Sequence, residues 1–202
     1  IEFGFLGGGR MATAIKDGLL KSKSVKDIAV YDPFLNTESS WNECVVYKSL
    51  EELFANTKWL FLCVKPQIFK AELEKFKSCE FNGSGVVSVM AGIDTQEIET
   101  AFESIPVIRT MPNTPMMLGK GMLALCSGKN ASESDLSYVE SLFTEIADTL
   151  IVNEDQMDGV TAISGSGPAY FFYLSEMIEK NCETLGFSKA DAKKLWVNTM
   201  KG

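Results

Sequence analysis

Residues 1–12 have the sequence Ile1-Glu2-Phe3-Gly4-Phe5-Leu6-Gly7-Gly8-Gly9-Arg10-Met11-Ala12, and this stretch decides the fold. It predicts a short apolar strand, a glycine turn and a helix that begins near Met11. Gly7, Gly9 and Ala12 match the spacing G-x-G-x-x-A of the dinucleotide-binding fingerprint. The first glycine permits a tight turn, the second lets the backbone approach a pyrophosphate, and the small third residue lets the helix pack on the strand. The free N–H groups at the helix start then face the phosphates.

A second apolar run supports this interpretation. The run Ile28-Ala29-Val30-Tyr31 ends in Asp32, which follows Ala12 by 20 residues. An acidic residue at about this spacing accepts a hydrogen bond from the adenosine ribose in dinucleotide-binding folds. The alternative is a glycine-rich turn that joins a strand to a helix without binding a ligand. The position of Asp32 favours the nucleotide site.

Apolar runs that predict strands alternate with helical segments as far as about residue 152. Strands are predicted at 59–64, 85–90 and 107–111, and two further segments, 122–126 and 150–152, are predicted to be edge strands. This alternation is typical of an α/β fold with a mostly parallel sheet and helices on both faces. We therefore predict a Rossmann-type domain over residues 1–154.

Five loops follow the carboxyl ends of the predicted strands, where ligands bind in such sheets. They lie at Gly7–Gly9, Asp32, Cys63–Pro66, Met90–Gly92 and Met111–Pro115. Loops between strands and helices contain Gly and Pro in any case, so one such loop alone would be weak evidence for a ligand site. Together they predict a single elongated cofactor groove.

The pattern changes near residue 155, beyond which we find no further strand pattern. The stretch Ser164-Gly165-Ser166-Gly167-Pro168-Ala169-Tyr170 leads into a long apolar helix that Gly186 ends, and Ser188 caps another helix. We predict an all-helical second domain over residues 155–202 that is too short to close a bundle. Its apolar faces would be exposed in a monomer, so we expect an incomplete domain or packing against another subunit.

The composition excludes several classes of protein. The net charge of −8 argues against nucleic-acid binding, and no apolar run approaches the length of a membrane span. The sequence contains no histidine, which excludes Ser-His-Asp catalysis and His-ligated metals, and we predict no metal site. Five scattered cysteines without C-x-x-C spacing predict reduced thiols in a cytoplasmic protein. They are Cys44, Cys63, Cys79, Cys126 and Cys182.

Taken with the fingerprint, three further motifs resemble those of the pyrroline-5-carboxylate reductase family over the whole length of the chain. The motifs are Val64-Lys65-Pro66-Gln67, Arg109-Thr110-Met111-Pro112-Asn113-Thr114-Pro115 and Ser164-Gly165-Ser166-Gly167-Pro168-Ala169-Tyr170. The resemblance implies an oxidoreductase that reduces 1-pyrroline-5-carboxylate, a cyclic imino acid, to L-proline in the last step of proline biosynthesis. It implies NADPH or NADH as the hydride donor and a homodimer or higher homo-oligomer that assembles through the C-terminal helices.

The resemblance also implies roles for particular residues. Leu6, Gly7, Gly8, Gly9, Arg10 and Met11 would contact pyrophosphate and ribose, while Cys63, Val64, Lys65, Pro66, Met90, Ala91 and Gly92 would line the rest of the groove. Asn113, Thr114, Ser164, Gly165, Ser166 and Gly167 would approach the nicotinamide and substrate. A Ser/Gly/Thr-rich loop that holds the substrate carboxylate in the family would lie beyond these 202 residues. For Arg109, a structural ion pair and a functional role remain open.

The adenosine end departs from the family pattern. Many members have an asparagine ahead of the 59–64 strand that helps hold a phosphorylated ribose, and Leu50 stands there in this chain. Asp32 would repel a 2′-phosphate, whereas Arg10 could pair with one. On balance we expect NADH to be used at least as well as NADPH.

Two other functions remain open. One is another imine or β-hydroxyacid reductase of the same architecture. The other is a dinucleotide-sensing protein that keeps the fold without catalysis.

Overall fold

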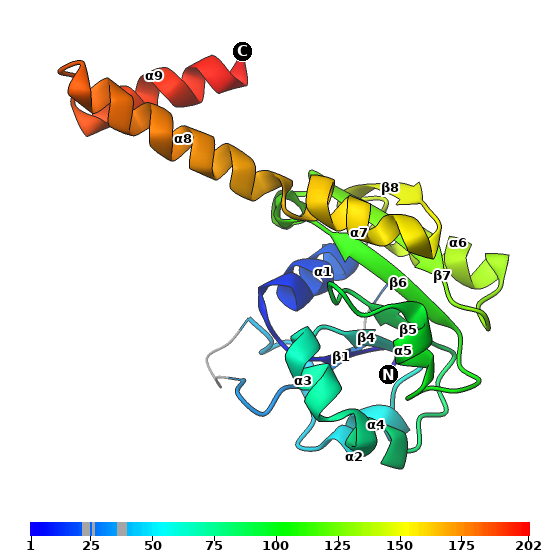
Figure 1. Ribbon diagram of the computed structural model, residues 1–202. Coiled ribbons are helices and arrows are strands. Elements are labelled where there is room, and N and C mark those ends of the chain that lie inside the picture. The colour runs from blue at the N-terminus through cyan, green and yellow to red at the C-terminus, as the bar shows by residue number, and fades with distance from the viewer. Residues whose placement is uncertain (22–24, 26, 36–39) are drawn as a thin grey trace. The chain divides into compact units, whose positions relative to one another are not determined.

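The computed structural model describes residues 1–202 apart from 22–24, 26 and 36–39 (Figure 1). It forms two compact units, residues 1–165 and 166–202. The predicted domain boundary after residue 154 stays a prediction.

The described part of the first unit contains one eight-stranded sheet with the order β3-β2-β1-β4-β5-β6-β7-β8. The first strand, β1, lies between β2 and β4, so its carboxyl end faces the point where the strand order changes direction. The strands are β1 (Phe3–Leu6), β2 (Ile28–Tyr31), β3 (Val45–Val46), β4 (Trp59–Leu62), β5 (Gly85–Ser88), β6 (Val107–Pro112), β7 (Gly121–Ser127) and β8 (Ala147–Ile151). In doubly wound sheets this change of direction marks the ligand crevice.

Strand β7 differs from the prediction. It lies inside the sheet between β6 and β8, and it runs antiparallel to β6, with Thr110 opposite Leu125. A short connection through the 3₁₀ helix η1 (Thr114–Leu118) and left-handed Gly119 returns the chain directly beside β6, as short connections do between antiparallel strands. The prediction of an edge strand at 122–126 is therefore wrong. The edge position belongs to β8, as predicted for the 150–152 segment.

Helices cover both faces of the sheet, and each face has its own apolar core. The helices are α1 (Arg10–Lys21), α2 (Leu50–Ala55), α3 (Pro66–Ala71), α4 (Leu73–Ser78), α5 (Thr95–Glu99) and α6 (Glu133–Phe143). Because side chains alternate along a strand, Phe61 packs with side chains of α1 and α6, whereas Leu60 and Leu62 pack with those of α2 to α5. Burial on both faces explains the continuous apolar runs in the sequence.

A short helical segment follows β8 and completes the first unit. It consists of the 3₁₀ helix η2 (Glu154–Gln156), α7 (Met157–Val160) and the π-helical turn η3 (Thr161–Gly165). Met157 is fully buried in a small cluster with Met111, Ala124 and Cys126. This cluster holds the segment against β6 and β7.

The second unit consists of helices α8 (Gly167–Thr184) and α9 (Lys189–Lys201), which pack against each other. Gly186 adopts a left-handed conformation after α8, and the Ser188 hydroxyl accepts the Asp191 N–H to cap α9, which confirms both predicted helix ends. The described residues contain no helix long and apolar enough to cross a membrane.

Candidate cofactor site

The fingerprint forms the predicted strand, turn and helix. Gly7 has φ +98°, and a Cβ atom there would lie 2.9 Å from the backbone carbonyl of Cys63. A Cβ atom on Gly9 would meet nothing within 4 Å. Backbone conformation therefore requires glycine at position 7, whereas at position 9 the space beside the backbone is open. This matches the two roles that the fingerprint gives to its first two glycines.

Asp32 follows β2 and joins two loops. Its Oδ2 accepts the Gly8 N–H at 2.8 Å, and its Oδ1 accepts the Phe34 N–H at 2.9 Å. Trp41 donates its indole N–H to the Gly8 carbonyl at 3.1 Å. The middle of the glycine turn is therefore fixed through both of its backbone polar groups.

A cavity of about 290 Å³ lies beside the glycine turn. Seven of the predicted cofactor residues line it, so the cavity brings the turns after β1, β2 and β4 to one site. The predicted lining residues are Leu6, Gly7, Gly9, Asp32, Cys63, Val64 and Lys65. Tyr31, Pro33, Phe34 and Ile68 line it as well, and the sequence analysis missed them. The Phe34 side chain is 91% exposed, so it belongs to no apolar pattern from which a site residue could be predicted. Its position two residues after Asp32 could have indicated that it lies at the cofactor site.

The remaining predicted cofactor residues do not line this cavity. Gly8 lies in the turn beside it, where its backbone N–H and carbonyl are bonded to Asp32 and Trp41. Arg10 is exposed, Met11 is partly buried at the start of α1, and Pro66 is the first residue of α3. The Met90 side chain is 2% exposed and belongs to the core, while Ala91 and Gly92 are exposed in the turn after β5. Leu50 is buried in the core and offers no contact to a ribose.

A second cavity of about 280 Å³ lies beside Gly92 and Arg109. Its other lining residues are acidic, namely Asp94, Glu154, Asp155 and Asp158. Arg109 is 3% exposed and forms an ion pair with Glu154. The structural ion pair that the sequence analysis left open for Arg109 is therefore present.

The predicted nicotinamide end is partly assembled within the first unit. Asn113 follows β6, donates its side-chain N–H to the Ser164 hydroxyl at 3.4 Å and accepts the Met122 N–H at 2.9 Å. Thr114 is exposed, and a Cβ atom on Gly165 would lie 3.3 Å from the Met111 sulfur. π-Helical turns such as the one that carries Ser164 and Gly165 occur frequently at functional sites. Ser166 and Gly167 belong to the second unit, where they begin α8.

The cysteines near these sites are protonated thiols. Burial raises the pKa of Cys63, and burial followed by the charge of Glu154 raises the pKa of Cys126 to about 12. Neither group is therefore an activated nucleophile. Among the described residues, no cluster of three or more Cys, Asp or Glu side chains could hold a metal ion.

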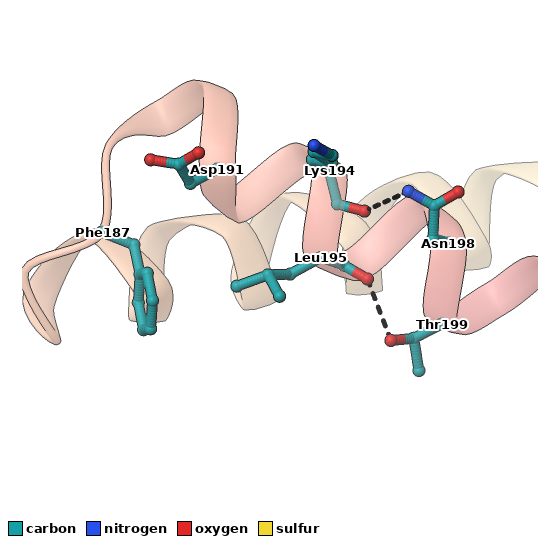
Figure 2. Close-up of a pocket in the computed structure, with 6 residues that line it drawn as sticks. All are labelled: Phe187, Asp191, Lys194, Leu195, Asn198 and Thr199. Carbon is teal, nitrogen blue, oxygen red and sulfur yellow. Dashed lines mark hydrogen bonds between the residues drawn. The ribbon is translucent and has the colours of Figure 1, made fainter.

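The second unit carries an open groove of about 690 Å³ along α9 (Figure 2). Asn198 and Thr199 bond to carbonyl oxygens of their own helix, at 2.8 Å to Lys194 and 2.9 Å to Leu195. Phe187 and Leu195 present apolar surface to the groove. Its other lining residue is Asp191.

Known proteins resemble the chain along its whole length. A family model described as pyrroline-5-carboxylate reductase dimerisation matches residues 154–202, and one described as NADP oxidoreductase coenzyme F420-dependent matches residues 2–92. The pyrroline-5-carboxylate reductase of Haemophilus influenzae is 33% identical over 98% of this chain and 75% of its own length. The chain belongs to the pyrroline-5-carboxylate reductase family. This confirms the resemblance inferred from the three motifs.

Other members of the family are also similar to this chain. The pyrroline-5-carboxylate reductase of Corynebacterium melassecola is 40% identical over 71% of this chain and 54% of its own length. The structure of Plasmodium falciparum pyrroline carboxylate reductase with NADP bound is 29% identical, covers 100% of this chain and 76% of its own, and superposes with a TM-score of 0.85. These likenesses confirm the predicted fold class, a Rossmann-type domain followed by a helical dimerisation domain.

Proposed function

We propose that this protein reduces 1-pyrroline-5-carboxylate to L-proline with hydride from NADPH or NADH. The observation that carries the proposal is a cofactor cavity at the glycine fingerprint of a chain that belongs to this family. Gly9 and the start of α1 suit a pyrophosphate, because the space beside Gly9 is open and the N-terminus of a helix favours anions. Gly7 makes the tight turn that brings them there.

We assign the groove residues accordingly. Leu6 to Met11 contact the pyrophosphate and the adjoining ribose, and Asp32 faces the adenosine ribose. Cys63 to Pro66 and Met90 to Gly92 line the path toward the nicotinamide. The exposed Phe34 and Ile68 offer apolar surface to the adenine. At the other end, the nicotinamide and substrate lie near Asn113, Thr114 and Ser164 to Gly167.

When bound, the reduced nicotinamide supplies a hydride to the C=N carbon of the imine. The electrons of the C=N π bond then remain on nitrogen, which takes up a proton. Solvent can supply this proton, which is consistent with a chain that contains no histidine. The side chains at this end therefore hold the two rings in contact and exclude water.

NADH is used at least as well as NADPH in this proposal. Two backbone N–H groups fix the Asp32 carboxylate in the wall of the cavity. There it would accept a hydrogen bond from the adenosine ribose and repel a phosphate. Arg10 is exposed beside the turn and would favour the phosphate. The carboxylate has the stronger effect because two backbone N–H groups hold it in place.

The functional state is a homodimer, or a higher homo-oligomer, formed through the C-terminal helices. The match of residues 154–202 to a dimerisation family supports this, as do the exposed apolar side chains of the second unit. These are Tyr170, Phe171, Phe172, Tyr173, Leu174, Met177, Leu185, Phe187, Leu195 and Met200. The location is cytoplasmic, which agrees with five cysteines that are all unpaired.

The test is oxidation of NADH and of NADPH by the purified protein in the presence of 1-pyrroline-5-carboxylate, followed by the loss of cofactor absorbance. The proposal expects turnover and proline as the product. Cofactor binding without turnover would overturn it in favour of a dinucleotide-sensing protein. Turnover of other imines or of β-hydroxyacids alone would indicate another reductase of the same architecture.

A further inference from the structure

An ion pair between the buried Arg109 and the partly exposed Glu154 joins strand β6 to the segment that follows β8. The Arg109 guanidinium donates from Nη1 to the Glu154 carboxylate, and its Nη2 lies 3.8 Å from an Asp158 oxygen. Nε and Nη2 of Arg109 are buried and have no hydrogen-bond partner. The guanidinium therefore uses only one of its nitrogens for a hydrogen bond.

Glu154 connects three elements of the first unit. Besides the Arg109 bond to β6, its carboxylate accepts the N–H of Thr95, the first residue of α5, at 3.2 Å. It also accepts the thiol of Cys126 on β7 at 3.3 Å. Because Glu154 is the first residue of η2, these bonds fix the beginning of the segment 154–165.

The end of the same segment is fixed close to the same strand. Asn113, four residues after Arg109, bonds to the Ser164 hydroxyl, and Gly165 packs close to Met111. Four residues of extended chain span about 13 Å. Strand β6 and the residue that follows it therefore set two attachment points, one at each end of the segment.

Stability alone does not account for this pair. The Arg109 side chain is 3% exposed and has lost most of its solvation, and the Glu154 side chain, 33% exposed, has lost part of it. Because of this cost, apolar replacement of a buried ion pair is often neutral or stabilising. The unpartnered nitrogens of Arg109 increase that cost. The buried Met157 already supplies apolar contact for the segment. Apolar contacts tolerate small shifts, whereas directional hydrogen bonds define a register.

We propose that Arg109 and Glu154 are positioning residues that set the register of residues 154–165 on β6. They thereby place Ser164 and Gly165 at the nicotinamide end of the site. The catalytic consequence rests on the proposed function, while the positioning itself does not.

The test compares Glu154→Asp with Glu154→Gln. Aspartate keeps the charge but withdraws the carboxylate by one methylene. Glutamine keeps the reach and one acceptor oxygen, which serves Arg109, while its amide nitrogen takes the place of the oxygen that faces Thr95 and Cys126. A displacement of about 1 Å can cost about a hundredfold in rate. We expect kcat to fall by about 30-fold or more in Glu154→Asp and by less than about fivefold in Glu154→Gln. The dissociation constant of NADH should change by less than about threefold in both, because the pyrophosphate end is untouched.

Amide hydrogen exchange of residues 157–165 gives a second readout that needs no turnover. Exchange should increase about tenfold in Glu154→Asp and remain near the parent value in Glu154→Gln. Glu99→Asp is the matched control, since Glu99 is 5% exposed and accepts the Lys129 N–H at 2.7 Å, outside the segment. It should change neither kcat nor this exchange.

A larger effect of Glu154→Gln than of Glu154→Asp, in exchange or in kcat, would show that charge and not position matters, and would overturn the proposal. Equal and parent-like behaviour of both variants would also overturn it. If the parent protein does not reduce 1-pyrroline-5-carboxylate, the proposed function fails, and the exchange comparison still decides on positioning.

Discussion

Replacement of Asp32 by asparagine should shift the cofactor preference toward NADPH. Asparagine is nearly isosteric and can still accept one of the two N–H groups, from Gly8 or Phe34, that the carboxylate accepts now. Two unit charges about 4 Å apart interact by about 1 kcal/mol in water, and a ribose phosphate carries up to about two charges. Since Asp32 is half-buried and open to solvent, the repulsion that the substitution removes is about 2 kcal/mol.

This energy corresponds to about a 30-fold change in an equilibrium constant. The affinity for NADH should fall at the same time by about fivefold, because a charged acceptor for the ribose hydroxyl becomes neutral. The ratio of kcat/KM for NADPH to kcat/KM for NADH should therefore increase by about 30-fold or more. The assay is initial-rate kinetics with each cofactor at saturating imine.

The control is Asp27→Asn, which removes the same charge from an exposed residue just before β2. The four residues of β2 lie between it and Asp32, and these five steps of extended chain span about 16 Å. This distance exceeds the Debye length of about 8 Å at physiological salt. The control should leave the ratio unchanged. A ratio within about threefold of the parent value in Asp32→Asn, or an equal shift in the control, would refute the assignment of Asp32 to the ribose.

Three further predictions concern the glycine turn, acid stability and assembly. Gly7→Ala should lower the melting temperature by about 4 °C or more, because a left-handed alanine costs about 1–2 kcal/mol and its Cβ also meets backbone. Gly9→Ala should leave the melting temperature unchanged and weaken NADH binding about tenfold in a fluorescence titration. A lower melting temperature for Gly9→Ala than for Gly7→Ala would contradict the roles assigned to the two glycines. Burial raises the pKa of Glu154, but the hydrogen bonds from Thr95 and Arg109 and the charge of Arg109 outweigh it and hold the pKa below the usual 4.5. Its stabilising contribution is therefore present above pH 4.5 and lost as the pH falls through the lowered pKa, so denaturant titrations should show a smaller loss of stability in acid for Glu154→Gln. Phe172→Asp, at a side chain 69% exposed on α8, should reduce the molar mass measured by light scattering toward that of a monomer, and an unchanged mass would exclude this surface from the interface.

Much of the fold could be predicted from local patterns. The fingerprint at Gly7, Gly9 and Ala12 predicted a strand, turn and helix, and the apolar runs predicted the parallel strands, because local backbone and burial preferences fix these features. The position of β7 could not be predicted in this way. Its apolar run is buried on both faces, but such a run does not say which strands lie beside it, and only the pairing with β6 and β8 places it inside the sheet.

The residues of the candidate site were likewise predicted only in part. Asp32 could be predicted because its distance from Ala12 in the sequence follows from one βαβ unit. Its bond to the Gly8 N–H could not, since it depends on how two loops meet. Phe34 and Ile68 were missed because an exposed apolar side chain has no periodic signature. Glu154 was missed because 45 residues separate it from Arg109.

The sequence by itself determined the family, the fold class and the turns after β1, β2 and β4 that line the cavity beside the fingerprint. These features rest on glycine conformations, on helix caps and on the spacing of apolar residues, all of which act over a few neighbouring positions. The tertiary structure alone decided the position of β7, the lining of the cavity and the partner of Arg109. Each of these depends on contacts between residues distant along the chain, which form only when the sheet brings its strands together.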